Sequence, residues 1–211
     1  MLPIETLLTF AVAATLLSLS PGPSNLYIMA RTMSSGHTSG IAAASGMAIG
    51  SMLYVLATAF GLAAVFSLYP TSYIVLKLTG AAYLIYLGAS AFWHEAESAT
   101  TKPKLKSMSR KQVFNQSIVV ELTNPKTALF FMAFLPQFAD PAAGNLVLQL
   151  IILGLLYAVI AFSSDLLMVF MSHKLGRWLS THPAFPVWQD RVSGSILIGL
   201  GTFIAMQEID L

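Results

Sequence analysis

The feature that most constrains the fold of this chain is a series of apolar segments, each close to or longer than the length needed to cross a bilayer. A membrane-spanning helix needs about 20 consecutive, mostly apolar residues. Six segments of the sequence meet or approach this requirement. They cover about 5–32, 40–68, 72–93, 112–137, 146–172 and 188–207. The sequence therefore predicts an all-α membrane protein with six transmembrane helices.

The composition agrees with this interpretation and excludes several classes of protein. Of 211 residues, 56% are apolar and 9% are charged, whereas a soluble domain carries about 25% charged residues. We therefore expect a single transmembrane transporter domain over 1–211. The net charge of +2 is too small to indicate a nucleic-acid partner, and the lack of cysteine excludes disulfides and thiolate metal sites. Catalytic, P-loop and dinucleotide motifs are also missing from the sequence, so we expect neither enzymatic activity nor a cofactor.

The distribution of basic residues predicts the orientation. Positive side chains collect in the cytoplasmic loops of membrane proteins. Nine of the eleven Lys and Arg residues fall on one side of the six-helix layout: Arg31, Lys102, Lys104, Lys106, Arg110, Lys111, Lys174, Arg177 and Arg191. The opposite side holds Glu5, Asp140 and the acidic tail. Both termini are therefore expected outside. The short sixth segment leaves a five-helix alternative open, although that layout breaks the charge pattern.

Two halves of the chain resemble each other. Residues 20–29, SPGPSNLYIM, and 122–131, LTNPKTALFF, each contain a prolyl break followed by an aliphatic and aromatic run. Residues 77–84, KLTGAAYL, and 191–198, RVSGSILI, share a basic, aliphatic, hydroxyl, glycine order. Because the first half begins outside and the second inside, we expect two inverted three-helix repeats, about 1–100 and 110–211.

Prolines should interrupt helices 1 and 4 near mid-membrane, because proline removes a backbone donor and clashes with the preceding turn. Backbone groups freed at that depth must face a cavity, a ligand or another helix. The helix starts at Pro23 and Pro125 carry partial positive charge, which suits a carboxylate. The residues expected to bind substrate surround these breaks: Ser20, Pro21, Gly22, Pro23, Asn25, Asn124, Pro125 and Lys126. The alternative is that each proline is a kink packed by its neighbours.

Two acidic residues, Glu121 and Asp165, fall inside predicted helices. A carboxylate at this depth is costly unless it is paired or hydrated, and such residues commonly serve function. Either acid could bind a substrate ammonium or carry a coupling proton. The alternative is a structural ion pair with Lys126 or a cap on a broken helix. The sequence does not divide these roles between the two acids.

These motifs together resemble the lysine exporter and homoserine-threonine resistance (LysE/RhtB) family of bacterial amino-acid exporters. The resemblance covers nearly the whole chain and rests on Leu17-Ser-Leu-Ser-Pro21-Gly-Pro-Ser-Asn25, Gly36-His-Thr-Ser-Gly40, 76–88, Leu122-Thr-Asn-Pro-Lys126, Phe134-Leu-Pro-Gln-Phe138 and Asp165. It implies efflux of small amino acids or derivatives, such as threonine, homoserine or homoserine lactone, across the bacterial inner membrane by proton antiport. It also implies that both breaks and Asp165 line the pathway.

The expected partners are an amino-acid substrate, protons and the lipid bilayer, with a homodimer left open. Two other classes of function remain as alternatives. A divalent-cation exporter requires several convergent carboxylates or histidines, whereas the predicted helices offer only Glu121 and Asp165, so no metal site is expected. A non-transporting membrane scaffold requires neither paired broken helices nor an acid at mid-membrane.

Overall fold

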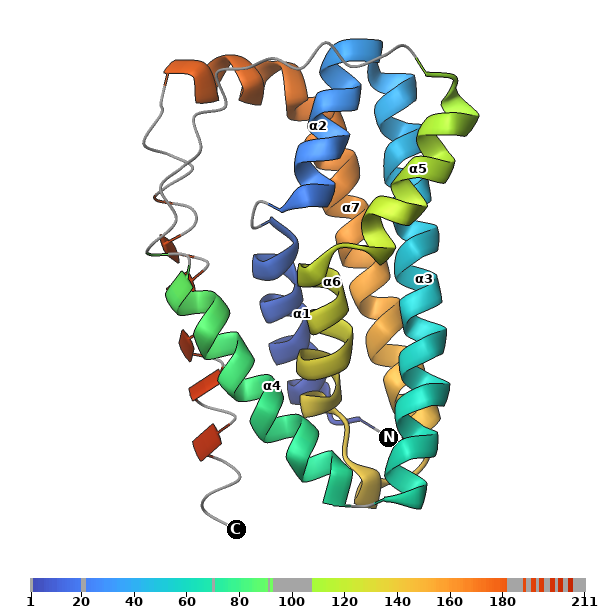
Figure 1. The fold of residues 1–211 in the computed structure, drawn as a ribbon, viewed down its shortest axis with the longest axis vertical. Coiled ribbons are helices and arrows are strands. Elements are labelled where there is room, and N and C mark those ends of the chain that lie inside the picture. The colour runs from blue at the N-terminus through green and yellow to red at the C-terminus, as the bar shows by residue number, and fades with distance from the viewer. Residues whose placement is uncertain are drawn as a thin grey trace.

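The chain is described by a computed structural model that covers residues 2–19, 22–69, 71–90, 92 and 108–181, together with scattered positions between 188 and 206. Every regular element within these residues is a helix. The α-helices are α1 (Ile4–Leu19), α2 (Pro23–Ser35), α3 (His37–Leu68), α4 (Thr71–Ser90), α5 (Arg110–Leu122), α6 (Pro125–Leu129) and α7 (Leu146–Thr181). Figure 1 shows α1, α3, α6 and α7 running roughly along the long axis, with α4 inclined across them.

Both expected helix breaks are present. The axes of α1 and α2 differ by 53°, and those of α5 and Pro125–Phe138 differ by 50°. Pro23 and Pro125 each open the helix after the break, where a missing backbone N–H removes no intrahelical hydrogen bond. After α6 the chain continues as a π-helical turn, Phe130–Phe134, and a 3-10 turn, Leu135–Phe138. Two residues of the first break, Ser20 and Pro21, lie outside the described part of the chain.

The described helices account for part of the expected topology. Two stretches, His37–Leu62 in α3 and Leu146–Ser172 in α7, are long and apolar enough to cross a membrane, and counting each bent pair as one crossing raises the total to four. Helix α4 adds a shorter apolar stretch, Leu78–Ser90. The expected sixth helix falls largely outside the described residues. Six crossings, the inverted repeat and the side of the termini therefore stay predictions.

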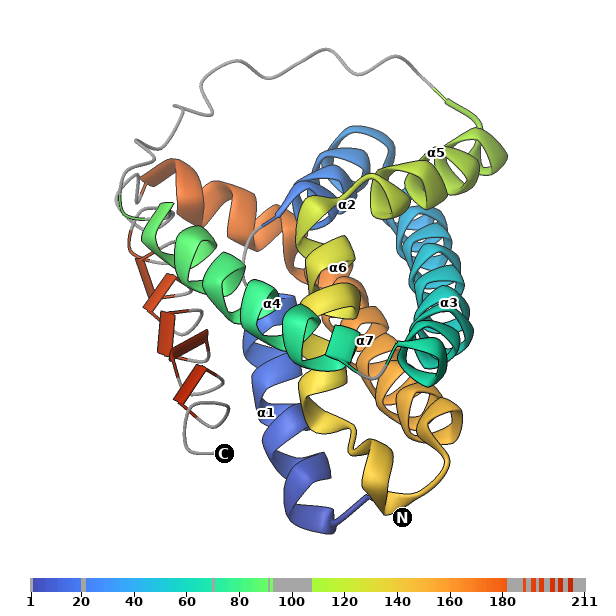
Figure 2. The same ribbon diagram turned by 60° about the horizontal axis from the view of Figure 1, so that its bottom comes forward.

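Helix α3 packs between α5 and α7, and small residues permit the close approach (Figure 2). A Cβ atom added to Gly50 would lie 2.7 Å from the Cβ of Glu121 on α5. A Cβ atom added to Gly154 on α7 would lie 2.8 Å from a methyl group of Val55 on α3. Both positions require glycine, as is common where membrane helices pack tightly.

The apolar core is richest in aromatic residues between α1, α7 and the segment that follows the second break. Phe10, Phe130, Phe131, Phe134 and Tyr157 are buried there. The rings of Phe130 and Tyr157 stack with their centroids 3.9 Å apart. A smaller apolar cluster joins α2, α3, α5 and α7 at the other end of the bundle. The half that contains α1 is thus closed by aromatic packing.

Basic residues lie at one end of the bundle. The α2–α3 junction, the start of α5 and the end of α7 lie at one end, whereas the α3–α4 connection lies at the other (Figure 1). Arg110 and Lys111 open α5, and Lys174 lies near the end of α7. Arg31, which the sequence analysis counted with the cytoplasmic loops, instead lies within α2 and is 4% exposed. The placement of Arg31 in a loop is wrong, because α2 continues to Ser35 before the chain turns at Gly36, whose φ is +84°. Its place on the cytoplasmic side stays a prediction.

Candidate functional site

A small cavity lies where the two broken helices meet α7. Its lining comes from both breaks, from α1 and from α7: Ser18, Gly22, Ser24, Asn25, Glu121, Asn124, Lys126, Thr127, Tyr157, Ala161 and Asp165. Six of the residues expected from the sequence are therefore gathered at one place. Pro23 and Pro125 start the helices beside the cavity. We call it the central cavity.

Glu121 connects three helices through hydrogen bonds. The carboxylate is 4% exposed at the end of α5. Ser24 of α2 donates to Oε2 at 2.6 Å, while Ser51 of α3 and Thr127 of α6 donate to Oε1 at 3.0 and 3.1 Å. An ionised carboxylate only accepts hydrogen bonds, so three hydroxyl donors satisfy most of its capacity. This arrangement ties both breaks and α3 to a single acid.

A second contact joins the two breaks directly. Asn124 Nδ2 donates to Ser24 Oγ at 2.8 Å. The amide oxygen of Asn124 accepts from the backbone N–H of Lys126 at 3.0 Å and so caps α6. The sequence-similar segments around Pro23 and Pro125 therefore contact one another in space.

Side chains replace hydrogen bonds that the breaks remove. Asn25 Nδ2 donates to the carbonyl of Ser18 in the last turn of α1, at 3.1 Å. The hydroxyl of Tyr54 on α3 donates to the carbonyl of Leu122 at the end of α5, at 2.7 Å. Both carbonyls face interrupted helix ends, where unpaired backbone groups would be costly in a membrane.

Lys126 and Asp165 complete the charged part of the site. The lysine side chain lies against the start of α2, because a Cβ atom added to Gly22 would be 3.4 Å from Lys126 Cδ and 3.8 Å from Nζ. Asp165 lines the cavity from α7. The lysine interacts electrostatically with both Glu121 and Asp165. With all three groups ionised, two acids and one base give this cluster a net charge of −1.

The central cavity is small, and one of its polar atoms is unsatisfied. Its volume is about 20 Å³, enough for a single water molecule and too small for an amino acid. Ser18 is 8% exposed, and its hydroxyl has no hydrogen-bond partner among the described residues. The structure is therefore a closed conformation, in which a larger ligand requires helix movement.

Several residues of this site were not expected from the sequence. Ser24 and Thr127 are adjacent to expected residues and could have been found by their hydroxyl groups beside the prolines. Ser18, Ser51 and Tyr157 carry no comparable signal, because each belongs to a long apolar helix whose rotation cannot be deduced from its sequence. The tertiary packing brings them to the breaks.

The fold and the site together define a helical membrane protein in which two broken helices meet at a charged cavity. The chain belongs to the LysE type translocator family, which matches residues 15–208. This match confirms the family expected from the sequence motifs.

Three curated relatives match across nearly the full length of both proteins. The homoserine/homoserine lactone efflux protein of Salmonella typhimurium is 29% identical, over 93% of this chain and 94% of the relative. The leucine efflux protein of an Enterobacter species is 26% identical, over 93% of each chain. An uncharacterized membrane protein of Pseudomonas aeruginosa is 27% identical, also over 93% of each chain. No solved structure matches the chain.

Proposed function

We propose that this protein exports small amino acids or their derivatives, of the threonine, homoserine and homoserine lactone type, across the bacterial inner membrane by proton antiport. The observation that carries this proposal is the central cavity, which combines two broken helices with one lysine and two acids. The names of the homoserine/homoserine lactone and leucine efflux relatives support the substrate class.

The charges of the cavity match the charges of such substrates. An ammonium group is common to amino acids and homoserine lactone. Glu121, Lys126 and Asp165 carry a net charge of −1, so binding of the cationic lactone leaves the cluster neutral. A zwitterionic amino acid leaves the net charge unchanged and pairs its ammonium with an acid. The carboxylate of an amino acid then binds at the helix starts of Pro23 and Pro125, where partial positive charge and Lys126 favour an anion.

We assign different roles to the two acids. Glu121 accepts three hydrogen bonds and holds the breaks together. Asp165 lines the central cavity from the long helix α7. It can therefore exchange a proton for a substrate ammonium while the hydrogen bonds to Glu121 stay in place. The substrate ammonium and the proton therefore compete for Asp165. A proton from outside displaces the substrate outward, and the proton is released when Asp165 faces the cytoplasm.

The proposed cycle is alternating access. The cytoplasmic half parts between α2 and α5, whose contact includes the hydrogen bonds of Tyr27 and Arg31 to Gln116. The outer half parts at the aromatic packing around Phe130 and Tyr157. The central cavity, with a volume of about 20 Å³, has no room for a substrate in the structure, so each opening in turn must expose it to one side. Proton and substrate fluxes are coupled if the change between the two openings occurs only with a proton or a substrate bound at Asp165.

A transport assay with purified protein tests the proposal. Proteoliposomes are loaded with radiolabelled threonine, homoserine, homoserine lactone, leucine or lysine, and a pH gradient is imposed. We expect gradient-driven efflux of at least one neutral amino acid or of the lactone, and a decrease of about 100-fold or more in Asp165→Asn, because the exchanging charge is lost.

Asp140→Asn is the matched control, since Asp140 is an exposed acid that does not line the central cavity. It caps a short turn, a role that asparagine can keep. It should transport at the wild-type rate. Absence of efflux for every compound would reject amino-acid export. Full activity of Asp165→Asn with persistent gradient dependence would reject the role of Asp165.

A further inference from the structure

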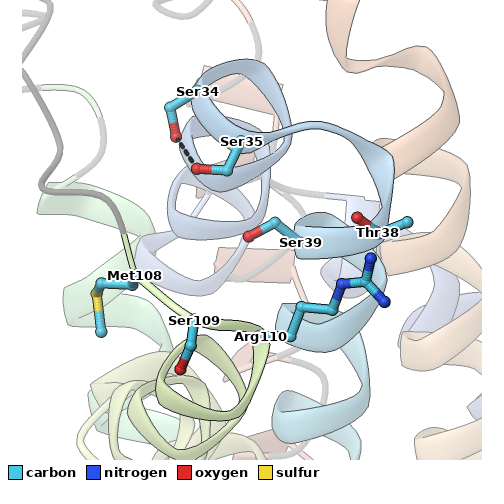
Figure 3. Close-up of a pocket in the computed structure, with 7 residues that line it drawn as sticks. All are labelled: Ser34, Ser35, Thr38, Ser39, Met108, Ser109 and Arg110. Carbon is cyan, nitrogen blue, oxygen red and sulfur yellow. Dashed lines mark hydrogen bonds between the residues drawn. The ribbon is translucent and has the colours of Figure 1, made fainter.

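A second and larger cavity lies at the basic end of the bundle, between the α2–α3 junction and the start of α5 (Figure 3). We call it the mouth cavity. Its volume of about 530 Å³ is within the range of roughly 300–1,000 Å³ that is typical of small-molecule sites. Five of its seven lining residues carry hydroxyl groups, and the other two are Met108 and Arg110.

One hydroxyl group in the mouth cavity is buried and unsatisfied. Ser39 is 4% exposed, and its Oγ has no hydrogen-bond partner in the part of the chain that the structure describes. Figure 3 shows this oxygen directed into the space between α2 and the start of α5. A buried hydroxyl without a partner is costly, so a ligand or water is required to satisfy it.

The other groups of the mouth cavity favour an anion. Helix α3 begins here after Gly36, and no side chain caps its N-terminus. The first backbone N–H groups of a helix lack intrahelical partners and carry partial positive charge. Arg110 adds a full positive charge beside Thr38 (Figure 3), and none of the seven lining residues is acidic. Backbone donors, the unsatisfied Ser39 hydroxyl and a guanidinium are groups that suit an oxyanion.

Polar contacts continue from the mouth cavity toward the central cavity along the α2–α5 interface. Met108, which lines the mouth cavity, accepts a hydrogen bond from buried Arg31. Arg31 and Tyr27 both donate to Oε1 of Gln116 on α5, at 3.0 and 2.8 Å. One to two turns further on, Ser24 contacts Glu121 of the central cavity. Arg31, Tyr27 and Ser24 lie on one face of α2, spaced by four and three residues.

We propose that the mouth cavity binds the carboxylate of the amino acid on the cytoplasmic side, before the substrate passes between α2 and α5 to the central cavity. This inference rests on the proposed export function and adds a substrate site to it. The Arg31–Gln116–Tyr27 contacts separate the two cavities in the closed conformation. A phosphate group shares the oxyanion chemistry, so the experiments must distinguish it from a substrate carboxylate.

A kinetic test uses inverted membrane vesicles, in which export appears as uptake and the cytoplasmic substrate concentration can be varied. Arg110→Gln should raise the half-saturating concentration of the transported amino acid about five- to tenfold without changing the maximal rate, because one charge-assisted contact is lost. Arg110→Lys should recover most of the affinity. Homoserine lactone has no carboxylate, so its half-saturating concentration should not change.

Lys111→Gln is the matched control for Arg110→Gln. It removes the same charge from the neighbouring residue, which does not line the mouth cavity. Its half-saturating concentration should equal that of the wild type. An equal effect of both substitutions would overturn the proposal, because it indicates a general surface potential. An equal effect of Arg110→Gln on the amino acid and the lactone would also overturn it, because the loss would then not depend on the carboxylate.

A labelling test measures binding without requiring transport. Since the natural chain has no cysteine, Thr38→Cys places a single thiol in the mouth cavity. The transported amino acid should slow its reaction with a membrane-impermeant thiol reagent at least threefold in inverted vesicles, whereas the corresponding amino-acid amide should not. Met33→Cys, at an exposed position near the end of the preceding helix α2 and outside the mouth cavity, should react equally with and without the amino acid.

The two tests separate failure of this site from failure of the exporter. Transport by the wild type without protection of Thr38→Cys would overturn the site and leave the exporter intact. Protection without any wild-type transport would support the site and reject export. Protection by inorganic phosphate but not by the amino acid would overturn the substrate assignment and identify a phosphate site.

Discussion

At the scale of single residues, the two acids near the breaks differ in their surroundings. Both acids line the central cavity and interact electrostatically with Lys126. Glu121 in addition accepts hydrogen bonds from hydroxyl groups of three helices. Three hydrogen bonds from different helices tie Glu121 to the packing between them. For this reason we propose Asp165, and not Glu121, as the acid that exchanges its bound cation.

Glu121→Ala should destabilise the protein. The substitution leaves the hydroxyls of Ser24, Ser51 and Thr127 without their acceptor, and we expect a loss of about 3 kcal/mol in the free energy of unfolding. Thermal unfolding of the purified protein in detergent measures the effect as a lower Tm. Glu5→Ala, at the exposed start of α1, should leave the Tm unchanged. Equal Tm values for Glu121→Ala and the wild type would contradict the network.

At the scale of elements, the breaks and the close helix contacts act together. The proline-initiated helices α2 and α6 turn their starts toward the central cavity, and α3 holds α5 at the distance that places Glu121 between them. Gly46 and Gly50 allow this distance, because added Cβ atoms would meet the backbone of Phe114 and the side chain of Glu121. The geometry of the site thus depends on a glycine face outside it.

Gly46→Ala should separate α3 from α5 and lower both the Tm and the transport rate. The added methyl group would overlap the carbonyl of Phe114, which cannot move without its helix, and overpacking of this kind costs about 1–3 kcal/mol. Gly61→Ala is the control on the same helix, where an added Cβ has nothing within 4 Å. Its Tm should be unchanged or slightly higher, since alanine favours a helix over glycine. A Tm for Gly46→Ala as high as that of Gly61→Ala would refute the close contact.

At the scale of the whole molecule, the central cavity is closed in two different ways. Aromatic rings from α1, α7 and the segment after the second break pack on one side, and the hydrogen bonds of Tyr27, Arg31 and Gln116 join α2 to α5 on the other. Polar contacts can exchange with water when they separate, whereas the aromatic rings must leave a tightly packed core. We therefore expect the α2–α5 interface to open toward the cytoplasm.

A cross-link across the α2–α5 interface tests this movement. Tyr27→Cys and Gln116→Cys introduce the only two thiols of the chain at a contact seen in the closed conformation. A short bifunctional thiol reagent should stop transport by the double variant, because α2 can no longer leave α5. Each single variant, treated in the same way, should keep its activity. Undiminished transport after complete cross-linking would show that the cytoplasmic opening lies elsewhere.

Local features of the sequence were sufficient for the helical class and for the positions of both breaks. Proline changes backbone geometry at its own position, so Pro23 and Pro125 predict helix starts without any tertiary information. The same holds for Gly22, Asn25, Asn124 and Lys126, which are expected near the cavity because they adjoin the prolines. Arg31 was misjudged because neither the extension of α2 nor its burial against α5 is a local property.

The sequence alone determined the membrane setting, the helical class and the two breaks, since each follows from composition, apolar length or a residue's own backbone chemistry. Its motifs also indicated the family, through their resemblance to known members. Only the tertiary structure decided which hydroxyls surround Glu121, that Lys126 lies against Gly22, and that Ser39 and Arg110 share a cavity. These contacts depend on the rotation and separation of helices distant in sequence. In a long apolar helix, no local sequence pattern shows which side faces its neighbours. Packing against those neighbours, with glycine at the closest contacts, determines the rotation of the helix.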